Sequence, residues 1–223
     1  KNANRLRRFL NQKKRGPVAF VLAGKKIDTG PSVVSKVTVG KKLLDTKMQA
    51  GDFMIVIGAV AYSFILARYL VDKNLSPKDL KESQIKELIG NSYYQKDILE
   101  DAMHLIRRSR EKRINLIISE DHLTLPAPKG KLNLDGDISA VDGTFGPSNA
   151  ERSGVDIGPR TIKKIEAAFE KAKAIIISGP AGVYENPRTR KGSFAVLKAA
   201  EKQAKKKKIV IAGGGETEDL ASQ

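Results

Sequence analysis

The sequence has 223 residues, with 41 Lys and Arg against 25 Asp and Glu, a formal net charge of +16 and no cysteine. Without cysteine there is no disulfide framework, no thiolate nucleophile and no cysteine-ligated zinc site. A hydrophobic content of 40% allows a folded core. The longest apolar run, residues 53–67, is shorter than the roughly 20 residues of a membrane-spanning helix, so we expect a cytoplasmic protein with no membrane partner.

Strand and helix patterns alternate along most of the chain. Short apolar runs predict strands buried on both faces, at residues 17–23, 53–57, 114–119, 174–178 and 209–212. Other segments predict helices, at residues 2–14, 33–48, 60–71, 95–112, 159–173 and 191–205, with a further helix start at Ser76 and Pro77. This order predicts an α/β fold, a doubly wound, mostly parallel, Rossmann-like sheet with helices on both faces.

The pattern breaks down between residues 120 and 152, where glycines and prolines indicate loops and irregular strands whose role stays open. The two ends also stand out. The sequence begins at Lys1 rather than Met, and residues 216–223 resemble the start of a helix. We therefore expect the natural polypeptide to continue at both ends.

Glycines follow four of the five predicted strands, at Gly24, Gly58, Gly179 and Gly213. In a doubly wound sheet, ligands bind beyond the carboxyl ends of the strands. Glycine lets backbone N–H groups approach a phosphate, and the N-terminus of the next helix adds positive potential. These corners predict a phosphate-bearing ligand, although glycines also serve simply to make tight turns.

Two groups of residues at these corners can act on phosphate. Glu216 beside a phosphate implies a bridging Mg²⁺, and the hydroxyl of Thr217 can donate to the same oxygens; a helix cap at Glu216 is the plain alternative. Lys25 and Lys26 follow the first strand, where an ammonium can contact a transferring phosphate, or both are solvated loop lysines.

Several other sites lack their motifs. There is no Gly-x-x-x-x-Gly-Lys-Ser/Thr loop and no Gly-x-Gly-x-x-Gly after the first strand, which disfavours a P-loop enzyme and a nicotinamide cofactor. His104, beside the apolar stripe of a helix, and His122, in an expected turn region, have no ligand partner three or four residues away, so we interpret both as structural or solvated. Ser178 lacks the Gly-x-Ser-x-Gly context of a hydrolase nucleophile.

The high positive charge has three explanations: a solvated lysine-rich surface, a nucleic-acid footprint, or attraction of small polyanions such as nucleotides. Only 5% of residues are aromatic, so stacking platforms for single strands are scarce. We therefore expect no nucleic-acid partner.

Five segments, in order, resemble motifs of the phosphoglycerate kinase family. They are VLAGK at 21–25, GAVAYSF at 58–64, GVDIGPRT at 154–161, SGPAGVYE at 178–185 and AGGGET at 212–217. The resemblance covers nearly the whole chain but only the C-terminal, nucleotide-binding half of that family. It implies that residues 1–15 form a linker helix from a missing N-terminal domain, and that residues 16–223 form a nucleotide-binding domain truncated at its C-terminus.

The family transfers a phosphoryl group between 1,3-bisphosphoglycerate and ADP, with Mg²⁺, in glycolysis. The resemblance implies ADP or ATP as substrate, a catalytic role for Lys25, Gly214 and Gly215, and Glu216 facing Mg²⁺. It also implies nucleotide contacts, at Lys25, Gly58, Ala59, Gly154, Val155, Pro180, Val183, Glu185, Gly214, Gly215 and Thr217. We expect a monomer that meets 3-phosphoglycerate only through the missing domain and is inactive by itself.

The sequence also departs from the family pattern. Thr29 stands where many members carry a second loop lysine, Ser178 replaces the usual Asn, Glu216 is one methylene longer than the common Asp, and Ala23 replaces a glycine. Thr29, Ser178 and the charge motivate an alternative, a non-catalytic descendant that serves as a basic module binding nucleic acid or a protein assembly.

Overall fold

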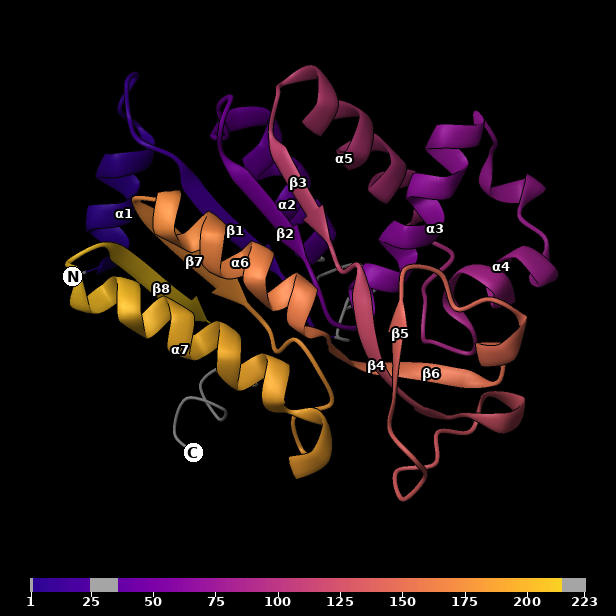
Figure 1. Ribbon diagram of the computed structural model, residues 1–223. Coiled ribbons are helices and arrows are strands. Elements are labelled where there is room, and N and C mark those ends of the chain that lie inside the picture. The colour runs from indigo at the N-terminus through magenta and orange to yellow at the C-terminus, as the bar shows by residue number, and fades with distance from the viewer. Residues whose placement is uncertain (1, 25–35, 214–223) are drawn as a thin grey trace.

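The computed structural model describes residues 2–24 and 36–213, with the side chain of residue 2 excepted. Its main sheet has the strand order β3-β2-β1-β7-β8, and every neighbouring pair in it is parallel. These strands are β1 (Val18–Leu22), β2 (Phe53–Val56), β3 (Asn115–Ile118), β7 (Ala174–Ser178) and β8 (Ile209–Gly213). The predicted fold class, a mostly parallel Rossmann-like sheet, is confirmed (Figure 1).

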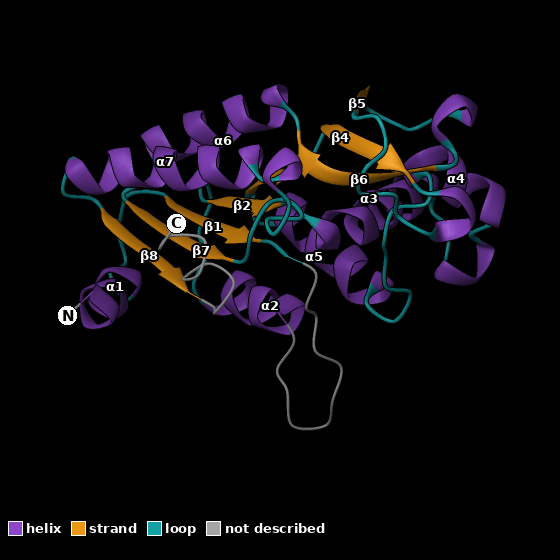
Figure 2. Ribbon diagram, turned by 90° about the horizontal axis from the view of Figure 1, so that it is seen from below, coloured by secondary structure: helices purple, strands orange, loops and turns teal. Residues whose placement is uncertain are grey.

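Helices cover both faces of this sheet, which explains why its strands are continuous apolar runs. The helices are α1 (Asn2–Leu10), α2 (Lys36–Thr46), α3 (Ala59–Lys73), α4 (Glu82–Ile89), α5 (Leu99–Glu111), α6 (Pro159–Lys171) and α7 (Lys191–Lys205). In β1, Phe20 and Leu22 pack in the same cluster as α2, α3 and α5, whereas Ala19 and Val21 pack with α6 and α7. Figure 2 shows α6 and α7 on one side of the sheet and α2 on the other.

The segment that we expected to be irregular forms a second sheet. Its strands are antiparallel, in the order β5-β4-β6, with bounds β4 (Asp121–Pro126), β5 (Ser139–Asp142) and β6 (Arg152–Ile157). The placement of His122 in a turn region was wrong, because it lies buried on β4. Prolines and glycines in and around these short strands interrupt the alternation of apolar and polar residues from which a strand is predicted.

Short 3₁₀ helices punctuate the connections, at η1 (Pro77–Asp79), η2 (Pro128–Gly130), η3 (Pro147–Asn149) and η4 (Pro187–Thr189). The helix start predicted at Ser76 is a 3₁₀ turn rather than an α-helix, closed by bonds from the Ser76 amide and hydroxyl to Asp79 Oδ2 (2.8 and 2.7 Å). None of the helices in the described parts of the chain combines the length and apolar character needed to cross a membrane.

The N-terminal segment is joined to the main sheet. Helix α1 packs its apolar side against the first residues of β1, β7 and β8. After it, the guanidinium of Arg15 pairs with the carboxylate of Asp52 at 2.6 and 2.8 Å, and both side chains are only 1% exposed. Asp52 Oδ1 also accepts the Val18 amide (2.8 Å), so this ion pair fixes the entry into β1. The interpretation of residues 1–15 as a linker stays a prediction.

Candidate functional site

The carboxyl ends of β1, β2, β3 and β7 meet at one edge of the main sheet. The chain turns from β1 toward β2 on one side and β7 lies on the other, so the strand order reverses next to β1. Such a reversal opens a crevice in which α/β proteins bind ligands. A backbone bond from the Val60 amide to the Gly24 carbonyl oxygen (3.2 Å) ties the first two glycine corners together.

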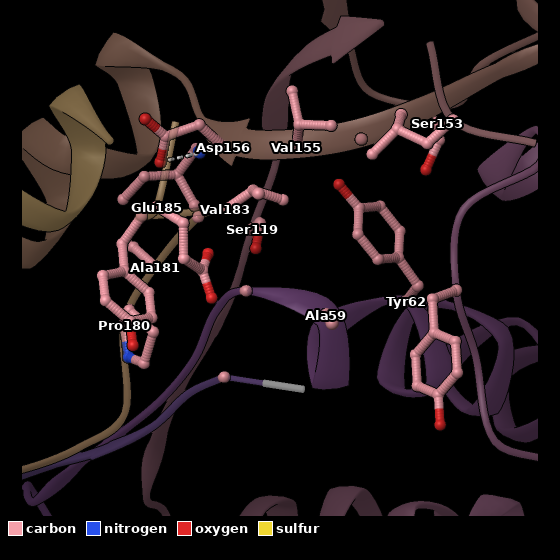
Figure 3. A pocket seen from close by; sticks show the side chains of 18 residues that line it. Ala59, Tyr62, Ser119, Ser153, Val155, Asp156, Pro180, Ala181, Val183 and Glu185 are labelled. Atoms are coloured by element: carbon pink, nitrogen blue, oxygen red, sulfur yellow. Dashed lines mark hydrogen bonds between the residues drawn. The ribbon is translucent and has the colours of Figure 1, made fainter. Parts of the chain in front are cut away.

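A cavity of about 420 Å³ lies at this edge, within the usual size range of small-molecule sites (about 300–1,000 Å³). All seven predicted nucleotide-contact residues that the structure describes line it: Gly58, Ala59, Gly154, Val155, Pro180, Val183 and Glu185. Figure 3 shows Tyr62 on one side of the space and Pro180, Val183 and Glu185 on the other, with Val155 between them. Gly24 lines the cavity as well, so four sequence motifs that are far apart along the chain share one cavity.

Strand β6 forms one wall of the cavity, and a β-bulge reshapes it. Leu123 pairs with Asp156 and Thr124 with Gly154, so Val155 is the additional residue on β6. A bulge frees backbone groups from the ladder and redirects side chains. The carbonyl oxygen of Val155 accepts the amide of Val183 at 2.8 Å, which joins β6 to the loop after β7.

Two glycines are required by close approaches in the wall. Gly58 has φ +71°, and a Cβ there would lie 2.8 Å from the Pro180 carbonyl oxygen. At Gly154 a Cβ would meet the phenol of Tyr62. A side chain at either position would therefore collide with the facing part of the wall.

Asp156 is a buried carboxylate in the lining that the sequence reasoning did not single out. Its Oδ2 accepts the Gly192 amide (2.7 Å) and its Oδ1 accepts the Ile157 amide (2.9 Å). Burial raises the pKa of Asp156 to about 7, although both hydrogen bonds oppose the shift. Asp156 lies inside the GVDIGPRT segment at 154–161. Its position between the apolar residues Val155 and Ile157 was the signal in the sequence that this carboxylate is buried.

Tyr62, which lines the cavity, and His122, which lies behind it, form a second buried polar group. The Tyr62 hydroxyl lies 3.2 Å from His122 Nδ1, and the two rings are tilted against each other. Burial, with the nearby charge of Asp156, raises the pKa of Tyr62, and burial lowers the pKa of His122 to about 4. His122 is therefore neutral at physiological pH and packs inside the protein.

Two partly exposed side chains, Tyr93 and Leu132, stand at the mouth of the cavity. Leu132 belongs to the loop between β4 and β5. Arg188, on η4, holds this loop by donating to the carbonyl oxygens of Leu134 (2.9 Å) and Gly136 (2.8 Å). No sequence pattern indicated this contact, because the partners lie more than 50 positions apart.

The described lining contains two carboxylates, Asp156 and Glu185, and neither lysine nor arginine. It is suited to an apolar ring and to hydroxyl groups rather than to phosphates. A cation lies nearby: Lys36, at the start of α2, donates its ammonium to the carbonyl oxygen of Ala23 at 3.0 Å. Lys36 was not predicted as a site residue.

The remaining predicted site residues lie outside the described parts of the chain. These are Lys25, Gly214, Gly215, Glu216 and Thr217, and the departure at Thr29 lies there too. Within the described residues, no group of three or more His, Asp and Glu side chains could hold a metal ion. The described residues of the cavity therefore do not provide a set of side-chain ligands that could coordinate Mg²⁺ by themselves.

Comparisons with known proteins all find phosphoglycerate kinases. The family model described as "Phosphoglycerate kinase" matches residues 1–223. A phosphoglycerate kinase of Candida albicans is 29% identical over 190 residues, covering 85% of this chain and 40% of the relative. One of Streptococcus uberis is 30% identical over 184 residues, covering 82% of this chain and 39% of the relative.

The structure of phosphoglycerate kinase from Coxiella burnetii superposes with a TM-score of 0.73 at 24% identity. The alignment covers 97% of this chain and 46% of that chain. At this identity the similarity shows the fold alone. The chain spans about 40% of the length of the curated relatives described above.

Proposed function

Because the chain belongs to the phosphoglycerate kinase family, we propose that its cavity binds the adenine and ribose of ADP or ATP. In this proposal the chain is the nucleotide-binding part of a kinase that transfers a phosphoryl group between 1,3-bisphosphoglycerate and ADP. The observation that carries it is the arrangement of Gly24, Gly58, Val155 and Pro180, one from each of four motifs, around one cavity of about 420 Å³.

The chemistry of the lining supports this orientation of the ligand. A flat base can lie between apolar and backbone surfaces, and the exposed carboxylate of Glu185 can accept bonds from ribose hydroxyls. The same carboxylate would repel phosphates, which places them on the side of Lys36 and the glycine corners. A helix N-terminus and an ammonium there stabilise negative charge.

Catalysis requires more than this chain in our proposal. In-line transfer needs the acyl phosphate within near-attack distance, and we assign 3-phosphoglycerate binding to an N-terminal domain that this chain does not include. Mg²⁺ bound to the nucleotide would neutralise phosphate charge, with Glu216 as the residue facing it. Lys25 would contact the transferring phosphate. We also propose a monomer with a cytosolic location.

Calorimetry with MgADP tests the nucleotide proposal. We expect binding in the micromolar to millimolar range, weakened several-fold by Glu185→Ala because the ribose hydroxyls lose an acceptor. Lys198→Ala, an exposed substitution on α7 away from the cavity, should leave the affinity unchanged. Undetectable binding of the unsubstituted chain at millimolar MgADP would contradict the proposal.

A full-length kinase carrying this segment tests the role of Lys25. Lys25→Ala should lower turnover by a larger factor than it weakens nucleotide binding, because the ammonium acts on charge that develops in the transition state. Equal losses in both would contradict that role. The alternative of a non-catalytic basic module gains no support from the relatives described above, which are phosphoglycerate kinases.

A further inference from the structure

A second hollow, of about 890 Å³, lies between α1 and the turn that joins α7 to β8. Its lysines immediately precede β7 and β8, so it lies at the amino ends of the strands, whereas the nucleotide cavity lies at their carboxyl ends. Its lining includes the cations Arg5, Arg8, Lys173, Lys206, Lys207 and Lys208, and no acidic residue. We call this hollow the basic groove.

The basic groove is a built feature, because both of its sides are held in place. Helix α1 is anchored by Phe9 and Leu10, which pack against the cluster that contains Ile209. Arg5 Nη2 donates to the carbonyl oxygen of Lys207 at 3.3 Å, which ties the helix to the opposite turn. Figures 1 and 2 both show α1 beside β8 at the edge of the main sheet.

Positive charges are crowded in the basic groove. Lys208 points its ammonium at the carbonyl oxygens of Phe169 (2.9 Å) and Glu170 (2.7 Å). Burial lowers the pKa of Lys208, and the charges of Lys206 and Lys173 lower it further, although Glu170 opposes them. The like charges therefore repel one another, and a bound anion would relieve this repulsion.

Part of this charge is already paired and part is not. Glu170 accepts from Lys206 at 2.9 and 3.1 Å. Within the described residues, the side chains of Arg8, Lys173 and Lys207 make neither a hydrogen bond nor an ion pair, and all three are exposed. Three cations on two sides of one groove are thus available to a ligand.

We propose that the basic groove binds a linear chain of phosphates, at a site separate from the nucleotide cavity. A volume of about 890 Å³ exceeds what one phosphate needs, and the cations line it on both sides. Guanidinium and ammonium donors both suit phosphate oxygens. The occupant that fits is an inorganic polyphosphate rather than single-stranded RNA, because Phe9 is the one aromatic side chain in the described lining and bases would find too few rings to stack on.

Charge reversal at Arg8 and Lys207 tests the proposal in the 223-residue chain. Tripolyphosphate binding is measured by calorimetry, and labelled oligo(U) binding by fluorescence anisotropy, both with saturating MgADP to occupy the nucleotide cavity. The control carries Lys42→Glu and Lys73→Glu, which change net charge equally at exposed positions outside the groove. Thermal melting establishes that both variants remain folded.

We expect the Arg8→Glu/Lys207→Glu variant to bind at least tenfold more weakly than the unsubstituted chain, and the control to bind within about threefold of it. For oligo(U), the slope of log K against log salt should fall by about 1.4, at about 0.7 for each lost phosphate contact. Binding of tripolyphosphate supports the proposal, whereas binding of oligo(U) alone would overturn it and indicate RNA as the occupant.

Equal weakening in the two variants would overturn the proposal, because net charge alone would explain binding. So would displacement of both probes by MgADP, failure of both probes to bind, or equally tight binding of a poly-glutamate peptide. None of these readouts requires the nucleotide cavity to bind MgADP. The proposal for the basic groove and the proposed nucleotide function can therefore fail independently.

Discussion

A Cβ atom placed on Gly154 would lie 1.6 Å from the hydroxyl oxygen of Tyr62. Tyr62 is 4% exposed and its hydroxyl lies 3.2 Å from His122 Nδ1, so a methyl group on residue 154 would force the ring out of this packed position. Gly154→Ala should therefore cost about 1–3 kcal/mol of unfolding free energy, as overpacking does. It should also lower MgADP affinity at least tenfold by displacing the cavity wall. Urea denaturation and calorimetry measure the two effects.

The double variant Gly154→Ala/Tyr62→Phe is the matched control. Removing the hydroxyl relieves the worst contact but leaves ring carbons close to the new methyl group. We expect partial recovery of both stability and affinity. An alanine variant as stable as the unsubstituted chain would show that the wall yields without cost, contrary to this prediction.

Arg188 holds the loop that carries Leu132 to the mouth of the cavity. Arg188→Ala removes both hydrogen bonds to the loop and should weaken MgADP binding about three- to tenfold, because the apolar rim is no longer positioned. Arg188→Lys can replace one bond but not the paired geometry, and should give an intermediate value. Because Arg188 is exposed, stability should change by less than about 1 kcal/mol.

Lys198→Ala again serves as the control, because it removes an exposed cation from α7 without touching the loop. If it weakens MgADP binding as much as Arg188→Ala does, long-range charge rather than loop position explains the effect. If Arg188→Lys equals Arg188→Ala, the paired geometry of the guanidinium is required.

The raised pKa of Asp156 predicts a specific pH dependence of stability. Its folded value is about 7 and its ordinary value is 3.8, so the folded state holds a proton that the unfolded state has lost between those limits. Its contribution to stability is therefore fully present below about pH 4 and is lost as pH rises through 7. The maximum slope is about 1.4 kcal/mol per pH unit for one proton.

Asp156→Asn provides the comparison. Its amide oxygen can still accept one of the two backbone bonds, so we expect a constant offset plus the loss of this slope. The unfolding free energy of the unsubstituted chain, minus that of the variant, should fall between pH 4.5 and pH 7.5 in urea titrations. Parallel curves for the two proteins would contradict the shifted pKa.

Lys36 places an ammonium beside the carboxyl end of β1. If phosphates lie there, Lys36→Met should weaken MgADP binding about tenfold and leave adenosine binding unchanged, since adenosine has no phosphate. Lys42→Met, on the exposed side of α2, should alter neither ligand. Equal loss of ADP and adenosine would indicate that Lys36 shapes the cavity rather than binding phosphate.

Local patterns were sufficient for the main sheet. Continuous apolar runs such as residues 174–178 are typical of strands covered on both faces, and the structure has β7 over the same residues. The same held for α7, whose predicted bounds, 191–205, match the structure. The motif resemblance also predicted that Gly58, Gly154 and Val183 belong to one binding site, and in the structure all three line the same cavity.

The sequence failed where the determining contacts are non-local. The strands of the second sheet are short, interrupted by Pro and Gly, and stabilised by pairing between residues about 15 to 35 positions apart, from Thr124 with Ser139 to His122 with Ile157. The bulge at Val155, the burial of Asp156 and the hold of Arg188 on its loop likewise depend on partners from other elements. Periodicity within one segment carries no information about such partners.

The sequence by itself determined the α/β class and the family, and it predicted a set of residues of which the described ones line one cavity, because buried strands and glycine corners leave local signatures. Only the tertiary structure decided the shape of the cavity, the proton affinity of Asp156 and the gathering of Arg8, Lys173 and Lys207 into one groove. These properties depend on burial and on distances between groups remote in sequence, which folding alone establishes.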